Sequence, residues 1–425
     1  MPPALRIVLF GLGHVGTTQA ACLAAAGHRV TGVERDPARR DAVARGRAPV
    51  REPGLDDLVA RGRASGRLAV AASAEPADVA LALAEADLAV VCVGTPAAAG
   101  GGLDLTAVAG LTRALGPPVR TRTADRPLLL AYRSTLPTGT MDGVVLPLLA
   151  EGAGEGPGRR YEAAYHPEFL RQGTAVADGR DPTRLVLGER WPGATRRLGG
   201  LYAAADPRVV ETSFAAAELA KLADNGWHAL KVAFANEVGR LAWAAGTDPQ
   251  AAMAIVRAGE DGEGYLRPGA PYGGSCLPKD LGTLLDGARA FGLELPALAG
   301  AVLSNERHLG WLLARVRAAA APPGPLLLVG LGFKPGSDDP RGSPLRALAH
   351  RLVAAGYAVR THDPDMSPSA LRAACREIGA APAPDLARTL APAAGVRLVV
   401  RGKPVRLPKD VPCLAIDALA GPDPT

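Results

Sequence analysis

A cysteine in a glycine-rich loop, followed closely by a lysine and an aspartate, is the stretch of this sequence best equipped for chemistry. Residues 272–280 read Tyr-Gly-Gly-Ser-Cys-Leu-Pro-Lys-Asp, so Lys279 and Asp280 come directly after the turn that holds Cys276. Glycines before a nucleophile let backbone N–H groups approach a reacting oxygen. A nearby ammonium favours the nucleophilic thiolate, and a carboxylate can accept a proton or hold a water molecule. The pattern favours a catalytic thiol over the alternative, an inert buried cysteine.

A glycine motif near the start of the chain indicates a dinucleotide site. The apolar run 7–10 leads into GxGxxG at 11–16, and a helical stretch then leads to a second predicted strand, 29–34. Such a turn lets a pyrophosphate sit on the helix N-terminus. Glu34 ends the second strand at about the spacing of the carboxylate that binds a ribose. Because Glu34 would repel a 2′-phosphate, the sequence predicts NAD rather than NADP, although Arg35 beside it opposes this preference.

Two further apolar runs end in hydroxyl residues. The runs 88–93 and 128–132 predict buried strands; Thr95 follows the first, and Ser134 and Thr135 follow the second. Ligands of open parallel sheets bind beyond the carboxyl ends of the strands, so we expect these side chains to point toward cofactor and substrate. The alternative is that each hydroxyl only caps a helix.

A proline-free stretch predicts one long helix. Apolar residues recur at helical spacing through residues 213–245, between glycine-rich stretches at 151–160 and 261–274 that predict loops. Lys221 and Asn225 are four residues apart and share a face of this helix. Charged residues on a long helix more often form a solvated face, but this pair lies on an otherwise apolar helix. We expect the helix to link two domains and to pair with its copy in a homodimer.

An α/β pattern begins again after the proline-rich residues 321–325. The segment 326–334 predicts a strand and a glycine-rich turn, 343–355 a helix and 358–363 another strand. The sequence therefore predicts an α/β protein with two Rossmann-like, doubly wound parallel sheets, joined by a long central helix and a small helical domain. The expected domains are 1–210, 211–320 and 321–425.

Composition limits the classes of protein that remain. A chain of 425 residues is too long for one core, and its 48% hydrophobic content contains no uncharged run of membrane-spanning length. The net charge of +6 suits phosphate ligands, but no basic run with aromatics predicts nucleic-acid binding. The five cysteines are scattered without metal-site spacing, and the N-terminus lacks a signal peptide pattern. These features predict a cytoplasmic protein without a bound metal.

These residues together carry a resemblance to a known family. The chain resembles the UDP-glucose/GDP-mannose dehydrogenase family over nearly its whole length, and within it the GDP-mannose 6-dehydrogenases. The matching stretches are Gly11, Gly13, His14, Val15 and Gly16 of the glycine turn, residues 52–55, 92–96, 133–135, 167–170, 218–225 and 273–280, and residues 332–334 with 338–339. The resemblance to the GDP-mannose branch comes from residues 227–239 and 267–269.

The resemblance implies a reaction and roles for the residues above. Members of the family oxidise the C6 alcohol of a nucleotide sugar to a carboxylate with two NAD⁺. Cys276 would form a thiohemiacetal and then a thioester, and Asp280 with a water would handle the alcohol proton. Lys221 and Asn225 would stabilise the oxyanion. Glu168 with Thr135 would position water for thioester hydrolysis, while Thr95, Ser134 and Lys279 would lie near the cofactor.

The resemblance also implies substrate contacts. Lys334 and Arg341 would bind the nucleotide diphosphate, Arg267 would reach the substrate of a neighbouring subunit, and the other expected contacts are Phe169, Leu170, Tyr272 and Gly273. The sequence departs from the family at His14, His166, Gln172 and Gly342, and residues 401–404 do not match the usual nucleotide-domain loop. These departures bear mainly on water activation and on the identity of the base and sugar.

Three functions from different classes remain open. The first is the four-electron oxidation, with GDP-mannose ahead of UDP-glucose or a UDP-N-acetylhexosamine as substrate. A two-electron NAD dehydrogenase would share the dinucleotide fold but would not need the Cys276 loop. A non-catalytic nucleotide-binding protein would not need Cys276, Lys221, Asn225 and Asp280 together.

Overall fold

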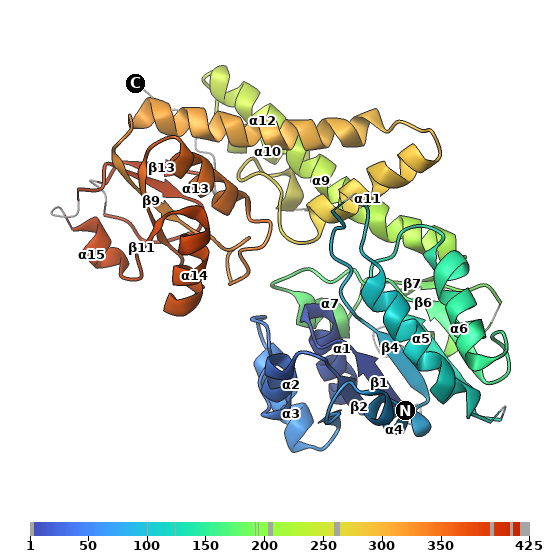
Figure 1. Cartoon of the computed structure of the whole chain (residues 1–425). Coiled ribbons are helices and arrows are strands. Elements are labelled where there is room, and N and C mark those ends of the chain that lie inside the picture. The colour runs from blue at the N-terminus through green and yellow to red at the C-terminus, as the bar shows by residue number, and fades with distance from the viewer. Residues whose placement is uncertain are drawn as a thin grey trace. The chain divides into compact units, whose positions relative to one another are not determined.

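The chain forms two compact units, each built on its own parallel sheet. The computed structural model describes residues 4–99, 101–123, 125–191, 193, 195–202, 207–258, 264–391, 395–408 and 411–416. The first unit covers Met1–Ala223 and the second Asp224–Thr425. Figure 1 shows the elements of both units along the chain.

An eight-stranded sheet forms the centre of the first unit, in the order β3-β2-β1-β4-β5-β6-β7-β8. β7 runs antiparallel to β6, and the other neighbours are parallel. The order places β1 and β4 on either side of the point where the connections change direction, and ligands of such sheets bind there. The strands are β1 (Arg6–Phe10), β2 (Arg29–Val33), β3 (Leu68–Val70), β4 (Leu88–Val91), β5 (Leu128–Tyr132), β6 (Tyr161–Tyr165), β7 (Arg184–Gly188) and β8 (Arg208–Thr212).

Helices cover both faces of this sheet because its strands are apolar on both sides. Ile7 and Leu9 of β1 belong to one core, whereas Val8 and Phe10, pointing the other way, belong to the other. The first face carries α1 (His14–Ala25), α2 (Pro37–Ala44), α3 (Leu55–Ala64), α7 (Ala175–Arg180) and α8 (Arg196–Gly200). The second carries α4 (Pro76–Ala84), α5 (Thr106–Arg120), the π-helix Met141–Val145, α6 (Leu146–Ala153) and the start of α9 (Phe214–Ala244).

The second unit combines helices with a five-stranded parallel sheet of order β11-β10-β9-β12-β13. α12, α13 and α14 contribute to the core on one face of this sheet, and α15 packs against the other. The strands are β9 (Pro325–Val329), β10 (Ala358–His362), β11 (Ala381–Pro382), β12 (Leu398–Arg401) and β13 (Cys413–Ala415). The helices after α9 are α10 (Pro249–Ala258), a 3₁₀ turn (Gly264–Leu266), α11 (Leu277–Ala290), α12 (Pro296–Ala319), α13 (Pro344–Ala354), α14 (Pro368–Ile378) and α15 (Leu386–Leu390).

The structure confirms the two parallel sheets and the long helix, with small errors at the ends of elements. The predicted strand 88–93 ends at Val91, because the chain turns there toward the site. The predicted loop 151–160 is wrong over its first three residues, since α6 continues to Ala153 and ends at Gly154 in the left-handed conformation. The start of the predicted loop 261–274 falls at 261–263, which lie outside the described residues. The division into three domains stays a prediction.

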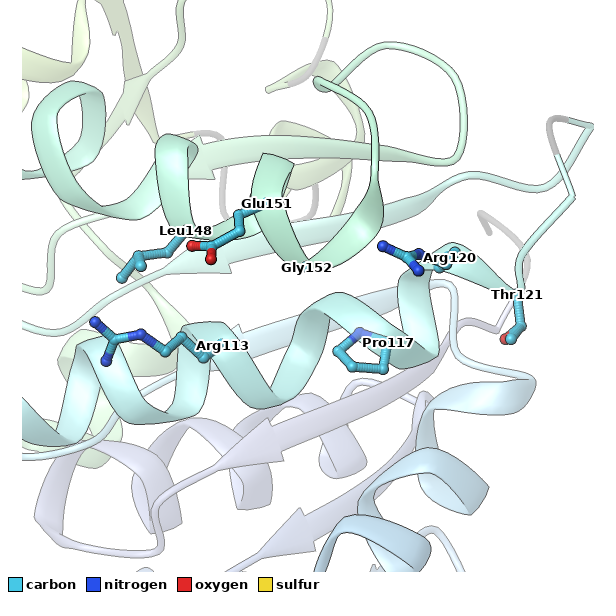
Figure 2. A pocket seen from close by; sticks show the side chains of 7 residues that line it. All are labelled: Arg113, Pro117, Arg120, Thr121, Leu148, Glu151 and Gly152. Atoms are coloured by element: carbon cyan, nitrogen blue, oxygen red, sulfur yellow. The ribbon is translucent and has the colours of Figure 1, made fainter.

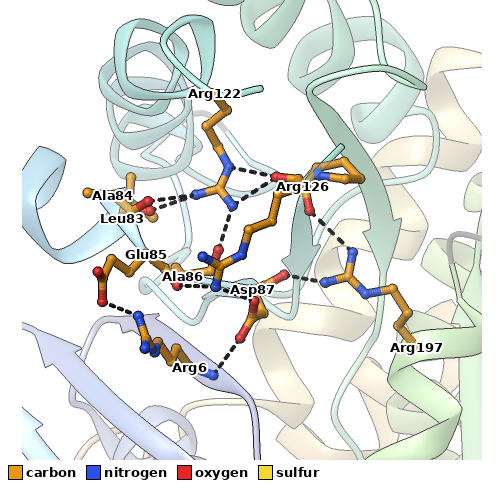
Figure 3. A network of polar contacts seen from close by, with 10 residues as sticks. Arg6, Leu83, Ala84, Glu85, Ala86, Asp87, Arg122, Arg126 and Arg197 are labelled. Carbon is orange, nitrogen blue, oxygen red and sulfur yellow. Dashed lines mark hydrogen bonds and ion pairs between the residues drawn. The ribbon is translucent and has the colours of Figure 1, made fainter. Parts of the chain in front are cut away.

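An arginine-rich network ties the amino ends of the central strands (Figure 3). Arg122 donates from Nη1 to the Leu83 carbonyl at 2.8 Å and from Nη2 to the Ala86 carbonyl at 2.8 Å. Asp87 accepts from the backbone N–H of Arg6 at 2.9 Å and from Arg126 at 2.9 Å. The network lies at the edge opposite the ligand edge of the sheet, so we assign it to stability rather than chemistry.

We expect the variant Arg122→Met to lower the free energy of unfolding by about 1–2 kcal/mol, because the partly buried carbonyls of Leu83 and Ala86 lose their donor. Urea unfolding, followed by circular dichroism, measures the change. Arg45→Met is the control, because the Arg45 side chain is exposed and its ion-pair contact with Asp41 is long, at 3.9 Å. An equal effect in the two variants would contradict the assignment.

Candidate functional site

The turn after β1 is shaped to receive a phosphate group. Gly11 has φ +89°, and a Cβ there would lie 2.8 Å from the Cys92 carbonyl oxygen. A Cβ on Gly16 would lie 1.8 Å from the Gly11 oxygen, so α1 starts close against the turn. α1 begins at His14 without a side-chain cap on its first N–H groups. Uncapped N–H groups behind a glycine turn suit an anion, so the geometry is compatible with the phosphate site that the sequence predicts here.

Glu34 lies buried at the carboxyl end of β2 and is fixed by the turn itself. Its Oε2 accepts the Leu12 N–H at 2.6 Å, and its Oε1 accepts the Asp36 N–H at 2.9 Å. A carboxylate has about four acceptor directions, so Glu34 can still accept from hydroxyl groups of a ligand. Arg35 beside it is exposed.

Glu52 is a buried carboxylate at the same turn that the sequence did not single out. Its Oε2 lies 2.8 Å from Nε2 of His14 and accepts the Gly173 N–H at 2.9 Å, while Oε1 accepts the Ala175 N–H at 2.9 Å. Burial opposes ionisation, but these hydrogen bonds outweigh it and lower the pKa of Glu52. His14, one of the departures from the family pattern, therefore has an ionised partner. The sequence offered one sign of this carboxylate, since Glu52 belongs to the stretch 52–55 that matches the family.

The hydroxyl residues connect the loops that follow β4 and β5. Thr95 donates to the Thr135 carbonyl at 2.9 Å, and Ser134 donates to the Val93 carbonyl at 2.7 Å. Neither hydroxyl caps a helix. Both hydroxyls donate to backbone carbonyls, so the two side chains hold the loop between β5 and the π-helix in place. This loop, residues 133–140, contains the half-buried Thr135 and is called the Thr135 loop below.

Glu168 and Lys221 form a buried ion pair in the first unit. The Lys221 Nζ lies 3.1 Å from Glu168 Oε1, and Oε2 accepts the Leu170 N–H at 2.8 Å. Burial opposes ionisation of Glu168, but Lys221, the Leu170 N–H and Arg133 outweigh it and lower its pKa. The Lys221 ammonium also lies 5.3 Å from the centre of the Phe169 ring. Glu168 is therefore an ionised acceptor beside a fixed cation.

His166, one of the departures from the family pattern, is a buried neutral group behind Glu168. Its Nε2 contacts the Arg133 guanidinium and lies 3.2 Å from the Tyr202 hydroxyl. Burial, with Arg133 close by, holds the pKa of His166 well below its ordinary value. The imidazole can thus accept from Arg133 without adding a second positive charge.

The cysteine loop lies in the second unit, at the start of α11. Cys276 is exposed and occupies the position before the first helical residue, where the helix dipole favours a thiolate. Asn305 binds both backbone groups of Tyr272, at 2.8 and 3.0 Å. The Gly274 N–H donates to the Gly342 carbonyl at 2.9 Å. A side chain at Gly342 would place its Cβ 2.4 Å from the Gly274 oxygen, which explains glycine at this position.

Asp280 is buried one turn into α11 and is held on both oxygens. Lys279 Nζ lies 2.5 Å from Oδ1, and Asn225 Nδ2 donates to Oδ2 at 2.5 Å. The Lys279 ammonium is therefore paired with Asp280, and its predicted effect on the Cys276 thiolate stays a prediction. The Asn225–Asp280 contact joins two of the predicted catalytic residues.

Arg341 carries a positive charge that interacts with the Cys276 thiolate. Its guanidinium donates to both carboxylate oxygens of Asp339, from Nε to Oδ1 at 2.8 Å and from Nη2 to Oδ2 at 2.6 Å. The hydrogen bond to Asp339 raises the pKa of Arg341, and so do the charges of Asp339 and of the Cys276 thiolate. The interaction is reciprocal, so Arg341 in turn favours ionisation of Cys276. Lys334 is half-buried in the same loop, and Arg267 is exposed.

Two asparagines, the buried Asn236 and the half-buried Asn305, support the loop that leads to the thiol and were missed in the sequence. Asn236 of α9 accepts the Gly269 N–H at 2.8 Å and donates to the Ala270 carbonyl at 3.2 Å. Asn305 of α12 holds Tyr272 as described above. The available signal was an isolated amide on an otherwise apolar helix face, since a buried amide needs partners.

The glycine turn after β9 is filled by a side chain of the same chain. Lys403, 1% exposed, lies 2.9 Å from Asp363 Oδ1 and 3.0 Å from Asp365 Oδ2 through its Nζ. A Cβ on Gly330 would lie 2.8 Å from Lys403 Cγ, and one on Gly332 2.8 Å from its Nζ. The glycines here make room for a lysine, whereas those after β1 leave the helix N-terminus uncapped. Lys403 belongs to the stretch 401–404 that departs from the family pattern.

A surface hollow on α5 and α6 is not part of these sites (Figure 2). It holds none of the predicted residues, and its lining consists of Arg113, Pro117, Arg120, Thr121, Leu148, Glu151 and Gly152. The two helices touch beside it, where a Cβ on Gly116 would lie 2.5 Å from the Gly152 Cα. Among the described residues, no cluster of three or more histidine, cysteine or acidic side chains could hold a metal ion, and no helix is long and apolar enough to cross a membrane.

Comparison with known proteins gives one consistent family. Models of the UDP-glucose/GDP-mannose dehydrogenase family match three stretches: its NAD binding domain at residues 5–206, its central domain at 215–307 and its UDP binding domain at 327–402. The GDP-mannose 6-dehydrogenase of Azotobacter vinelandii is 36% identical over 362 residues, covering 84% of this chain and 81% of that protein.

Relatives named for a UDP sugar are also similar. The UDP-glucose 6-dehydrogenase AglM of Haloferax volcanii is 34% identical over 369 residues, covering 85% of this chain and 83% of that protein. The solved structure of a UDP-glucose dehydrogenase from Pyrobaculum islandicum aligns with a TM-score of 0.84 and 33% identity, covering 94% of this chain and 90% of that one.

We expect the variant Arg341→Gln to slow alkylation of Cys276 by iodoacetamide at neutral pH, by roughly threefold, because an exposed charge pair is worth little in water. The pH at which Cys276 becomes reactive should rise. Peptide mass mapping separates Cys276 from Cys413, which is also exposed. Arg351→Gln is the control, since Arg351 pairs with Glu306; equal rates in the two variants would contradict the role of Arg341.

Proposed function

Because this chain belongs to the UDP-glucose/GDP-mannose dehydrogenase family, we propose that it oxidises the C6 alcohol of GDP-mannose to the carboxylate by way of a thioester on Cys276. It is an NAD-dependent nucleotide-sugar dehydrogenase. The observation that carries the finer proposal is the exposed Cys276 at the N-terminus of α11, one turn before the buried pair Asp280 and Asn225. The UDP-sugar alternative is kept because of the similar UDP-glucose dehydrogenases.

The turn after β1 fits NAD. Its uncapped helix N-terminus would bind the pyrophosphate, and Glu34 would accept from a ribose hydroxyl. NAD, when bound, supplies the hydride acceptor of the reaction. The chain's own part is to hold the pyrophosphate, to bind the ribose through a carboxylate that disfavours a 2′-phosphate, and to keep the Thr135 loop beyond the carboxyl ends of β4 and β5.

Cys276 provides the covalent step. Its sulfur attacks the aldehyde carbon, a C–S bond forms, and the carbonyl oxygen takes up a proton to give a thiohemiacetal. Oxidation of this adduct gives a thioester, and water then breaks the C–S bond, which releases the carboxylate and returns the thiol. Retention of the aldehyde on sulfur keeps a reactive intermediate from leaving between the two oxidations.

The other proposed catalytic residues have distinct tasks in the proposal. Asp280, held by Lys279 and Asn225, handles the alcohol proton with a water molecule, and Asn225 with Lys221 stabilises negative charge on the substrate oxygen. The lowered pKa of Glu168 makes it an ionised acceptor, which suits orientation of the hydrolytic water together with Thr135.

The substrate's diphosphate calls for fixed cations, which Lys334 and Arg341 of the loop after β9 supply in the proposal. Tyr272 and Gly273 lie on the loop before the thiol, and Phe169 and Leu170 follow Glu168, so these four are proposed sugar contacts. Similarity to GDP-mannose 6-dehydrogenase favours the GDP sugar. The three matched family models support the proposed division into an NAD domain, a central domain and a nucleotide-sugar domain.

We also propose a homodimer formed along α9, with Arg267 directed to the partner's substrate. In the second unit α9 exposes Trp227, Phe234 and Leu241, by 53%, 49% and 69%. These residues repeat every seven positions, so they share one face of the helix. A row of large exposed apolar side chains on one helix is typical of an interface.

We expect Phe234→Glu to give a monomer by light scattering at micromolar concentration, because a charge placed in the apolar row cannot be buried against a copy. Leu81→Glu is the control; Leu81 is 77% exposed on α4 of the first unit. A wild-type protein that is already monomeric and fully active would contradict the dimer.

We expect two NADH per nucleotide sugar consumed, and almost no net oxidation by Cys276→Ser, because a serine hydroxyl is barely ionised at neutral pH. Glu168→Gln should slow hydrolysis and leave a thioester that intact-mass spectrometry detects. Removal of both Cys276 and Glu168 should abolish this adduct.

A panel of GDP- and UDP-sugars in the same assay identifies the substrate. One NADH per sugar would indicate a two-electron dehydrogenase, and none with any sugar would indicate a non-catalytic nucleotide-binding protein. Near wild-type oxidation by Cys276→Ser, or an adduct on another cysteine, would contradict the thioester.

A further inference from the structure

Glu218 of α9 is a buried carboxylate with no role in the reaction described above. It is 0% exposed and lies three residues before Lys221, close to one turn of the helix. Its Oε2 accepts the Gly139 N–H at 2.6 Å, and its Oε1 accepts the Met141 N–H at 2.7 Å. Both oxygens of one side chain therefore bind the backbone where the Thr135 loop enters the helix that follows it.

This contact fixes the far end of the Thr135 loop. At the near end, Ser134 donates to the Val93 carbonyl, and Thr95 donates to the Thr135 carbonyl. Those two bonds tie the loop to the end of β4, and Glu218 ties it to α9. The place of Thr135 relative to the helix that carries Lys221 is thus set from both sides.

A local cap would satisfy the same N–H groups more simply. Thr140 stands at the start of the π-helix Met141–Val145, but its side chain donates to the Pro137 carbonyl at 2.6 Å and accepts no helix N–H. A serine or aspartate at a helix start usually fills this role without burying a distant charge. A cap from α9 differs from a local cap in one respect: it links the loop to the helix of Lys221.

The distant cap is energetically unfavourable. Burial raises the pKa of Glu218 to about 7, against the opposing effect of the backbone N–H groups of residues 139–141, and the nearby Asp142 adds to the rise. Stability alone poorly explains a buried carboxylate at position 218. An apolar residue there, combined with a local cap at the π-helix, would avoid the cost of burying a charge.

We propose that Glu218 is a positioning residue for the oxidation, holding the Thr135 loop on α9 so that Thr135 keeps one geometry with Lys221 and its partner Glu168. The inference rests on the proposed function, because it assigns Glu218 to the same reaction. Glu218 touches neither substrate nor cofactor in this role; it acts through Thr135 and Lys221.

Glu218→Gln tests the proposal, with Glu189→Gln as matched control. Glu189 accepts the backbone N–H groups of Gly193 and Thr195 at 3.1 and 3.0 Å, so it also is a carboxylate that binds two backbone N–H groups, but none of those of residues 133–145. Amide hydrogen exchange of residues 133–145 should speed up in Glu218→Gln and stay unchanged in Glu189→Gln. This readout needs no turnover, so it remains valid if the wild type oxidises no nucleotide sugar.

Steady-state kinetics then separates positioning from stability. Counted per NAD⁺-binding site, kcat of Glu218→Gln should fall by about tenfold or more, because small displacements of reacting groups slow catalysis steeply. KM for the nucleotide sugar should stay within about twofold. Glu189→Gln should keep the wild-type kcat per site.

Glu218→Asp covers the case in which Glu218→Gln does not fold. It keeps the charge but shortens the reach by one methylene, so the same faster exchange and lower kcat are expected. Unchanged exchange at 133–145, or unchanged kcat per NAD⁺-binding site in a folded Glu218 variant, would overturn the proposal. Failure of the wild type to produce NADH from any sugar would instead overturn the proposed function.

Discussion

Helix α9 sets the spacing of Glu218 and Lys221, on which the polar contacts in the first unit's site depend. α9 begins in the core of the first unit, where Phe214 and Ala217 pack against the sheet, and it continues without proline into the second unit. Glu218, Lys221 and Asn225 occupy successive turns, so their distances along the axis follow from helix geometry rather than from loop conformation. Side chains mounted on a regular element keep their positions better than side chains on loops.

Glu168, Lys221 and Asp280 are buried with partners, and the choice of partner decides what each can do. Glu168 beside Lys221 stays ionised and can only accept hydrogen bonds, whereas Asp280 has both oxygens occupied by groups of its own unit. His166 remains neutral beside Arg133 and so avoids a second buried cation. In each case removal of one partner would leave an uncompensated charge, which is far less favourable than the absence of the pair.

Local patterns in the sequence predicted the central strands of both sheets, the glycine turn and the long helix, but not β3, β6–β8 or β11–β13. Apolar and polar residues do not alternate in runs such as 128–132, because both faces of a parallel sheet are buried. Such a run is apolar throughout, and this made the strand recognisable in the sequence. The resemblance to a family supplied most of the candidate site, since the residues that form it lie far apart in sequence.

Pairings between distant side chains were not predictable from the sequence. Lys279 follows Cys276 closely, yet its ammonium binds Asp280, while Arg341, from a loop far along the chain, interacts with the thiolate. Helix periodicity gives the face on which a residue lies but not the group that faces it. Asn236 and Asn305 were missed for the same reason, because their partners are backbone groups of a loop that has no periodic pattern.

The lysine that fills the turn after β9 has a consequence for the order of events in catalysis. Lys403, between Asp363 and Asp365, fills the glycine turn of the second sheet, so among the described residues the turn after β1 is the one left for a dinucleotide. A reaction that removes four electrons would then have to use two cofactor molecules in succession at one place. Cofactor exchange would fall between the two oxidations, at the time when only the bond to sulfur retains the half-oxidised sugar.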